Sequence, residues 1–353
     1  MTRPASRPRI ALIGLGMASG PHARSLVDLQ HRIEVAAAFS PTEARRAAFA
    51  QRFPFPVTGD LDAIVDDRTI SAAIVLAPPA AHRPLVERLA AAGKHVLLEK
   101  PLAATLADAE AVVAACRRAG VMLSVVFQHR YRPAALALAE RVGAGALGAL
   151  ANASASVRWW RPQSYYDEPG RGTLVRDGGG VLMTQAIHTL DLFLSLTPAL
   201  EEVVAFATTS AAHRMETEDT VAGALRFAGG ALGAVDATTA AFPGFAERIE
   251  LAGTEATAVL ASGRLELFHR DGRRETVGEG EATGGGADPM AFTHDAHRAL
   301  INAFVDALYG GPAPANDGDA ALRVHDLIDA LLASSRQRRA VAVRQRQIGS
   351  GRI

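Results

Sequence analysis

The sequence predicts an α/β protein in which an N-terminal, doubly wound parallel sheet precedes an α+β domain with a large, mostly antiparallel sheet. Three observations lead to this fold class. Short apolar runs alternate with helical patterns over the first third of the chain. After about Arg132 the apolar runs lengthen and are joined by turns. With 353 residues, the chain is also long enough for two domains that each bury a core.

The first domain is expected to span residues 1–127. Its apolar runs and helical patterns alternate, and Gly93 stands where glycine commonly ends a helix. This alternation predicts a parallel sheet of five or six strands joined by crossover helices. The expected strands are 9–14, 33–39, 72–76, 94–98 and 122–127, and the expected helices are 19–29, 41–52, 81–92 and 107–119.

The second domain is expected to span residues 128–353. Turns at 228–230 and 253–254 join consecutive strands directly, which favours antiparallel pairing. Helices at 182–195 and 297–309 make this an α+β domain, and a last helix at 319–335 is expected to return and cover a sheet. The expected strands are 151–160, 203–209, 220–227, 231–240, 249–253 and 256–261.

Composition restricts the classes of partner. Hydrophobic residues make up 49% of the chain and charged residues 21%, which is typical of a globular protein. Because 37 basic residues balance 37 acidic ones, we expect neither nucleic acid nor an anionic membrane as a partner. Cys116 is the single cysteine, which excludes an intrachain disulfide and favours a reducing compartment. With no apolar run long enough to span a membrane, we expect a soluble, cytoplasmic protein.

A glycine-rich segment lies between the first expected strand and helix, where such a pattern is typical of dinucleotide binding. Gly14 permits a tight turn, Gly16 lets the backbone approach a pyrophosphate, and the helix start supplies free N–H groups. We expect Gly14, Gly16, Met17 and Ala18 to bind the dinucleotide. Ser19 stands at the third glycine position, where a small residue is tolerated. The alternative is an ordinary glycine turn.

The end of the second strand favours NADP over NAD. An acidic residue that would bond both ribose hydroxyls of NAD is replaced by Ser40. Ser40 and Thr42 can donate hydrogen bonds to a 2′-phosphate, and Arg45 can approach it as a planar donor. NADP is therefore the favoured cofactor and NAD remains possible. The alternative is that Arg45 and Arg46 only form the solvated face of a helix.

Five motifs in order resemble those of the glucose-fructose oxidoreductase and inositol dehydrogenase (Gfo/Idh/MocA) family of NAD(P)-dependent oxidoreductases, over nearly the whole chain. The resemblance implies a Rossmann domain, a homodimer or homotetramer, and further cofactor contacts from Ala77, Pro78, His82, Glu99, Lys100 and Gln128. The motifs are the glycine fingerprint, 77–82, 92–96 running into 99–101, 130–133, and 178–180 followed by 188–191.

Lys100 is the first predicted catalytic residue. It follows a parallel strand at its carboxyl end, which is where doubly wound sheets bind ligands. An ammonium near low-dielectric walls can hydrogen-bond a substrate oxygen and shuttle its proton. The resemblance implies the same role. The alternative is a lysine that only pairs with Glu99.

His188 is the second predicted catalytic residue. The spacing places Thr184, His188 and Asp191 on one face of a helix, where a histidine could take an alcohol proton and a carboxylate could fix its tautomer. Many family members have an acidic or amide residue in place of Thr184, so a mechanism that needs a second carboxylate is in doubt. The alternative is a core histidine satisfied by Asp191.

An aromatic cluster around Trp160 and Arg161 at the start of the second domain suits a sugar ring, although a core edge or an oligomer surface would explain it equally well. Arg130 and Tyr131 are expected to join Lys100, Thr184 and His188 in binding substrate. For the histidines of 294–297 no third ligand is at hand, so no metal is expected.

The sequence therefore predicts reversible hydride transfer between NADP(H) or NAD(H) and a hydroxyl or carbonyl carbon of a sugar, polyol or related small molecule. Two alternatives stay open. One is an enzyme that cleaves glycosides with no net redox change. The other is a non-catalytic dinucleotide-binding sensor.

Overall fold

The computed structural model describes residues 7–280 and 292–346, and its chain forms two compact units. The first unit contains the chain up to Gln128 together with a returning segment, Thr293–Ala321. The second contains His129–Phe292 and the chain from Leu322 onward. The chain first passes from one unit to the other between Gln128 and His129, one residue from the expected boundary. The helix expected at 297–309, in contrast, belongs to the first unit and not to the second.

The first unit is built on a six-stranded parallel sheet with the order β3-β2-β1-β4-β5-β6. Its central strands are mostly apolar and largely buried because both faces of the sheet are covered. The strand order reverses between β1 and β4, and ligands of doubly wound sheets bind beyond the carboxyl ends at such a point. The strands are β1 (Arg9–Ile13), β2 (Glu34–Phe39), β3 (Val57–Thr58), β4 (Ile70–Val75), β5 (His95–Leu98) and β6 (Leu123–Val125).

Helices connect these strands and include one from the returning segment. That helix, α10, packs against α1 and is held there by ion pairs from Asp28 to His294 at 2.9 Å and from Arg32 to Asp306 at 2.7 Å. The helices of this unit are α1 (Ser19–Asp28), α2 (Glu43–Ala50), α3 (Leu61–Asp66), α4 (His82–Ala91), α5 (Leu106–Ala119) and α10 (Asp295–Leu308).

The second unit is built on a nine-stranded sheet with the order β14-β13-β12-β11-β7-β10-β9-β8-β15. All its pairs are antiparallel except β7 with β10, so the predicted antiparallel hairpins β9–β10 and β11–β12 are confirmed. The strands are β7 (Leu150–Arg158), β8 (Leu200–Thr208), β9 (Thr220–Phe227), β10 (Leu232–Thr238), β11 (Arg248–Gly253), β12 (Ala256–Ala261), β13 (Arg264–His269), β14 (Arg274–Val277) and β15 (Val341–Ala342).

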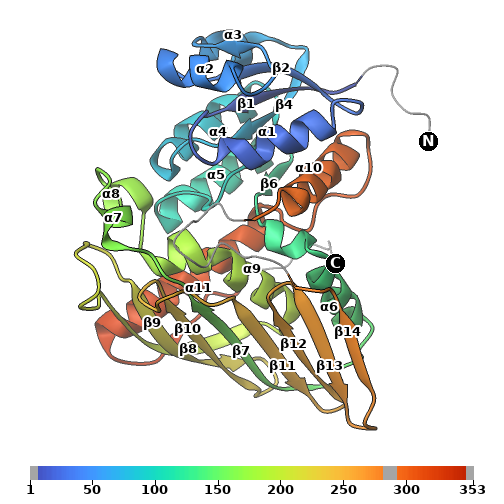
Figure 1. The fold of residues 1–353 in the computed structure, drawn as a ribbon, viewed down its shortest axis with the longest axis vertical. Coiled ribbons are helices and arrows are strands. Elements are labelled where there is room, and N and C mark those ends of the chain that lie inside the picture. The colour runs from blue at the N-terminus through green and yellow to red at the C-terminus, as the bar shows by residue number, and fades with distance from the viewer. Residues whose placement is uncertain (1–6, 281–291, 347–353) are drawn as a thin grey trace. The chain divides into compact units, whose positions relative to one another are not determined.

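Helices lie against one face of this sheet, as Figure 1 shows for α9 and α11. The Ser334 hydroxyl of α11 accepts a hydrogen bond from the Ala205 backbone N–H at 3.0 Å, so the predicted return of the last helix is confirmed. The helices are α6 (Pro133–Gly143), α7 (Gln163–Tyr166), α8 (Leu174–Asp177), α9 (Ile187–Leu196) and α11 (Gly318–Gln337). None of the helices in the described chain has the length and apolar character needed to cross a bilayer.

Candidate active site

The glycine loop after β1 depends on Gly14 for two separate reasons. Its backbone has a φ of +105°, a conformation that L side chains rarely adopt. A Cβ at this position would also lie 2.7 Å from the carbonyl carbon of Leu76, which follows β4. Gly14 therefore lets the loops after β1 and β4 approach each other at the point where the strand order reverses.

The start of α1 has the features of a pyrophosphate site. No atom of the described chain lies within 4 Å of a Cβ built on Gly16, so a ligand could approach the backbone there. No described side chain caps the helix at Ala18, and its first turn has no acidic residue. Its N–H groups and positive dipole end can therefore receive a phosphate. Ser19 donates its hydroxyl proton to the Gly16 carbonyl at 2.7 Å, which shows how a serine fits the third glycine position.

At the end of β2, one of two neighbouring arginines is held by backbone carbonyl oxygens. Arg46 donates from Nη1 to the carbonyl oxygens of Ser40 at 2.7 Å and Pro41 at 3.1 Å. Arg45, the predicted phosphate donor, has an exposed side chain. Ser40 is buried, and its hydroxyl accepts from the Thr42 backbone N–H at 3.3 Å. Arg46, weighed in the sequence only as a solvated residue, is thus the guanidinium held at the end of β2.

Lys100 follows β5 at the carboxyl edge of the sheet, as predicted. The Glu99 backbone N–H donates to the Val75 carbonyl of β4 at 2.8 Å, so this loop begins in register with the sheet. The Glu99 carboxylate lies 3.1 Å from Nε2 of His22, a buried residue of α1. The loop that carries Lys100 is thereby tied to the helix that follows the glycine fingerprint.

His82 lies beneath the loops and not on their surface. Its side chain is fully buried, and Nε2 is 2.7 Å from the Ala77 carbonyl. Nδ1 is 2.9 Å from the Pro101 carbonyl and 3.2 Å from that of Leu102. Burial lowers the pKa of His82, and the three carbonyl oxygens oppose this shift. His82 therefore links the loops after β4 and β5, which positions the predicted contact residues Ala77 and Lys100.

Gln128 ends the first unit with an unsatisfied polar atom. Its side-chain Oε1 is buried and has no hydrogen-bond partner among the described residues. A buried amide oxygen in this state costs free energy unless a donor reaches it. The predicted cofactor contact at Gln128 is compatible with that requirement.

The segment before His188 is wider than predicted. Residues Leu182–Ala186 form a π-helical turn, and α9 begins only at Ile187. The expected helical face shared by Thr184 and His188 is therefore distorted. The Thr184 hydroxyl donates to the Gly180 carbonyl at 2.7 Å. Turns of this kind often occur at functional sites.

Glu218 is a carboxyl group near this turn that the sequence did not single out. It accepts hydrogen bonds from the backbone N–H groups of Gly180 at 3.2 Å and Leu182 at 3.4 Å. Burial raises the pKa of Glu218, against the effect of these donors. The segment that carries Thr184 therefore has a buried carboxyl at its N-terminal end.

Asp191 forms a buried ion pair with Arg130. The guanidinium donates to the carboxylate from Nε at 2.5 Å and from Nη2 at 2.7 Å, and the Asp191 side chain has no exposed surface. Arg130 was predicted to bind substrate, and Asp191 was predicted to fix the tautomer of His188. Their pairing fixes the 3₁₀ turn at Gln128–Tyr131 to α9. Burial also raises the pKa of Tyr131 to about 12, so this phenol stays protonated near neutral pH.

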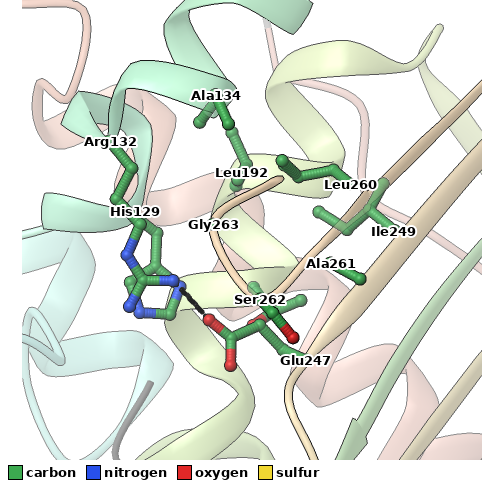
Figure 2. Close-up of a pocket in the computed structure, with 12 residues that line it drawn as sticks. His129, Arg132, Ala134, Leu192, Glu247, Ile249, Leu260, Ala261, Ser262 and Gly263 are labelled. Carbon is green, nitrogen blue, oxygen red and sulfur yellow. Dashed lines mark hydrogen bonds and ion pairs between the residues drawn. The ribbon is translucent and has the colours of Figure 1, made fainter. Parts of the chain in front are cut away.

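His129 is a residue that the sequence analysis missed. Its imidazole stacks on that of His188, with ring centroids 4.9 Å apart and planes at 28°. Nδ1 of His129 lies 3.9 Å from Oε1 of Glu247, to which Arg132 also donates (Figure 2). No local pattern could reveal this group, because Arg132 and Glu247 are separated by 115 positions in the sequence.

The aromatic cluster is more deeply buried than a sugar platform would be. Arg161 is only 2% exposed, and its guanidinium lies 5.2 Å from the ring centroid of Trp159. His213 contacts the carboxylate of Asp219 at 2.7 Å through Nδ1 and the Arg161 carbonyl at 2.8 Å through Nε2. Trp160 is half-buried and keeps part of its surface exposed. Much of the cluster therefore forms the core edge that was weighed as the alternative.

Two other groups bear on the chemistry. Burial raises the pKa of the Cys116 thiol to about 12, so this side chain is a poor source of thiolate. In the parts of the chain that the structure describes, no three His, Cys, Asp or Glu side chains gather to hold a metal ion.

Comparison with known proteins agrees with both units. A family model described as the oxidoreductase family with an NAD-binding Rossmann fold matches residues 8–127. A model of the GFO/IDH/MocA C-terminal domain matches residues 135–259. The two models together match well over half of the chain.

Individual relatives cover nearly the full length. D-apiose dehydrogenase of Paraburkholderia graminis is 29% identical over 95% of this chain and 89% of its own. The D-xylose 1-dehydrogenase (NADP(+)) 2 of Haloferax volcanii is 28% identical over 86% of this chain and 90% of its own. The WlbA dehydrogenase of Bordetella pertussis, solved with NADH and UDP-GlcNAcA, is 26% identical with a TM-score of 0.82, covering 97% of this chain and all of its own. With the dinucleotide-binding features of the first unit, these matches show that the chain belongs to the Gfo/Idh/MocA family of NAD(P)-dependent oxidoreductases.

Proposed function

We propose that this protein transfers a hydride reversibly between a nicotinamide dinucleotide and a hydroxyl or carbonyl carbon of a sugar or polyol. The observation that carries the proposal is Lys100 at the carboxyl edge of a sheet whose glycine loop fits a pyrophosphate. The bound nicotinamide would accept or donate the hydride, and the side chains of this chain would handle the proton. The relatives named for D-apiose and D-xylose support the substrate class.

Lys100 has the role of binding and polarising the reacting oxygen. Its ammonium would donate a hydrogen bond to the hydroxyl or carbonyl oxygen. The loop that carries it is held by His82 from below and by the Glu99–His22 contact from α1. Such constraints on the backbone matter because proton transfer requires the donor and acceptor to lie within hydrogen-bond distance.

His188 has the role of the base that takes the hydroxyl proton during oxidation and returns it during reduction. A histidine side chain can take up and release a proton near neutral pH, so it suits both directions of the reaction. The buried Arg130–Asp191 ion pair fixes the helix that carries His188. The stacked ring of His129 helps to fix the imidazole of His188 itself. The second carboxylate that many relatives use is replaced by the Thr184 hydroxyl, so this proposal gives no role to a carboxylate at that position.

The first test is the change in nicotinamide absorbance of the purified protein with sugars, polyols and lactones, with NADP and NAD supplied separately. Lys100→Met and His188→Ala should each lower kcat by a factor of about 10² to 10⁴, because each removes a group that handles the proton. Dissociation constants for NADPH should stay close to those of the wild type, which shows that the first unit is folded.

Other outcomes would redirect the assignment. Full activity of Lys100→Met would refute the role of this lysine. Glycoside cleavage without net change in absorbance would favour the redox-neutral alternative. Cofactor binding with no turnover on any compound would favour the sensor.

We also propose NADP as the preferred cofactor. Arg46 is held by the carbonyls of Ser40 and Pro41 at the end of β2, where a 2′-phosphate would bind. Arg46→Ala should weaken NADPH binding about tenfold, the size of one lost charge-assisted hydrogen bond, and leave NADH binding almost unchanged. Arg45→Ala is the matched control, with a smaller expected effect. Equal binding of NADH and NADPH by the wild type would refute the preference.

We further propose that the helix-free face of the large sheet binds a second copy of this chain. Along β8, Val204 and Phe206 are exposed, while Val203 and Ala205, which alternate with them, are buried under the helices. Apolar side chains that lie next to one another on an exposed sheet face are typical of an association surface. Phe206→Asp should convert a dimer or tetramer into a smaller species in sedimentation equilibrium. A monomeric wild-type protein would refute the proposal.

A further inference from the structure

We infer that His129 is a positioning residue that carries a proton beside His188 and so keeps His188 in its neutral, basic form. The inference rests on the proposed role of His188 as the base. The two imidazoles stack with centroids 4.9 Å apart, and both side chains are almost completely buried. Two stacked imidazolium ions would repel each other strongly, so one proton on the pair disfavours a second.

Glu247 attracts that proton to His129. Its Oε1 lies 3.9 Å from Nδ1 of His129 and also accepts from Arg132. Its other oxygen, Oε2, is buried and has no hydrogen-bond partner among the residues that the structure describes. A carboxylate 3.9 Å from the ring favours the charged form of His129 through the attraction of opposite charges, although no hydrogen bond joins the two groups. A buried carboxylate in this state also favours additional positive charge nearby.

The surroundings of the pair strengthen the coupling. A cavity of about 20 Å³ adjoins His129 and Glu247 and is lined in part by the apolar side chains of Leu192, Ile249 and Leu260 (Figure 2). Such a volume admits about one water molecule. Because charges in this environment are poorly screened, the interaction between the two rings is larger than it would be in water.

Asp191 and Arg323 are two further charged groups at α9, the helix that carries His188. Asp191, one turn further along α9, is bound by Arg130 through two hydrogen bonds. Arg323 of α11 donates to the Leu194 carbonyl at 3.0 Å. The neighbouring elements α6 and β7 pack against α9 with buried apolar side chains such as Leu138 and Val157. Glu247, in contrast, is a carboxylate that lies beside His129.

The pair should therefore bind protons in two separate steps. His129 takes the first proton at the higher pH, and His188 takes one only at a lower pH. His188 consequently remains able to accept the substrate proton at pH values where an isolated histidine would already be partly charged. A residue that only packed against His188 would produce no such separation.

The first test is the pH profile of kcat/KM for His129→Phe, which keeps a flat ring but removes the charge. The acid limb of the profile should move to higher pH by roughly one unit, since the repulsion on His188 is gone. A structural role alone would lower kcat without moving the limb. An unmoved limb in a variant that still binds NADPH would overturn the inference.

A second measurement does not depend on activity. In the wild type, ring-proton NMR should give His129 a higher pKa than His188, with the signals assigned by single-histidine variants. Glu247→Gln should lower the pKa of His129, whereas Glu250→Gln, a more exposed carboxylate on the same β11 segment, should leave it unchanged. A His188 titration that is identical in the wild type and His129→Phe would refute the coupling.

The two proposals can fail separately. Full activity of His188→Ala would end the role of His188 as base, and the NMR titrations would still decide whether the two rings are coupled. If His188→Ala loses activity but the His188 titration is the same in the wild type and His129→Phe, His188 keeps its role as the base and His129 loses its proposed role.

Discussion

The two units hold their proposed catalytic residues in different ways. Lys100 is in a loop that directly follows a buried parallel strand, and the contacts that fix this loop go mainly to backbone atoms, such as those of His82 with the Ala77 and Pro101 carbonyls. His188 is on a helix after a π-turn and is surrounded by side chains that pair with one another, including Arg130 with Asp191. A site built on backbone should tolerate side-chain changes better than a site built on side-chain networks.

Among the variants that test this difference between the units, Asp191→Ala is expected to cause the largest loss of stability. It leaves the Arg130 guanidinium buried without its carboxylate, which should lower the free energy of unfolding of the second unit by about 3 to 5 kcal/mol. Both tryptophans, Trp159 and Trp160, belong to this unit, so their fluorescence in a denaturant titration reports its stability.

The matched control is Asp236→Ala, which breaks the more exposed pair with Arg158 at the same 2.5 Å separation. Exposed pairs contribute little, so a change of about 1 kcal/mol or less is expected. Equal destabilisation by both variants would contradict the importance given to the buried pair.

A somewhat smaller effect concerns acid stability. His325 of α11 is buried, which lowers its pKa from the usual 6.5 to about 4, with a further contribution from Arg346. The unfolded chain binds a proton at this residue below pH 6.5 and the folded unit does not, so stability falls as the pH decreases from 6.5 to 4. The expected loss is about 3 kcal/mol.

The check is to compare unfolding of the second unit at pH 7 and pH 4 in the wild type and in His325→Phe, which cannot titrate. The variant should lose part of the pH dependence. An unchanged slope between the two pH values would show that His325 is not its source. In the first unit, carbonyl contacts oppose the corresponding shift at His82, so its buried histidine should contribute less acid sensitivity.

The smallest effect is expected from Ser19→Gly in the glycine loop. The variant loses the hydrogen bond from the serine hydroxyl to the Gly16 carbonyl, which contributes about 1 kcal/mol or less. The dissociation constant of NADPH, measured by fluorescence titration, should change only a few-fold. Gly14→Ala gives the opposite case, because its Cβ would collide with the Leu76 backbone, and it should abolish binding. A large loss of NADPH affinity in Ser19→Gly would contradict the view that this site is built mainly from backbone atoms.

The sequence predicted the first unit better than the second, which is the same difference between the two units. Strand alternation and the glycine spacing are local patterns, so they predicted the first sheet, the fingerprint loop and the position of Lys100. The two-residue strand β3 and the short helix α3 were missed because so few residues carry no periodicity. The large sheet was predicted in part, without β13, β14 and β15.

The remaining features depend on contacts between distant parts of the chain. Neither the stacking of His129 on His188 nor the pairing of Arg132 with Glu247 leaves a pattern in nearby residues. The choice between Arg45 and Arg46 was decided by which side chain reaches the backbone carbonyls at the end of β2. The π-helical turn at Leu182–Ala186 was also missed, because the spacing of its apolar residues looks the same as that of an α-helix.

The returning helix α10 has a consequence for how the protein is made. The ribosome synthesises the strands of the first sheet early, but α10, which covers α1, emerges only after residues 129–292 of the second unit have been translated. Until then the side of α1 that carries His22 and Ser25 lacks its cover, including the contact of His22 with His297. The nascent N-terminal segment therefore completes its folding late, and a chimera that exchanges whole units must carry residues 293–321 along with the N-terminal part.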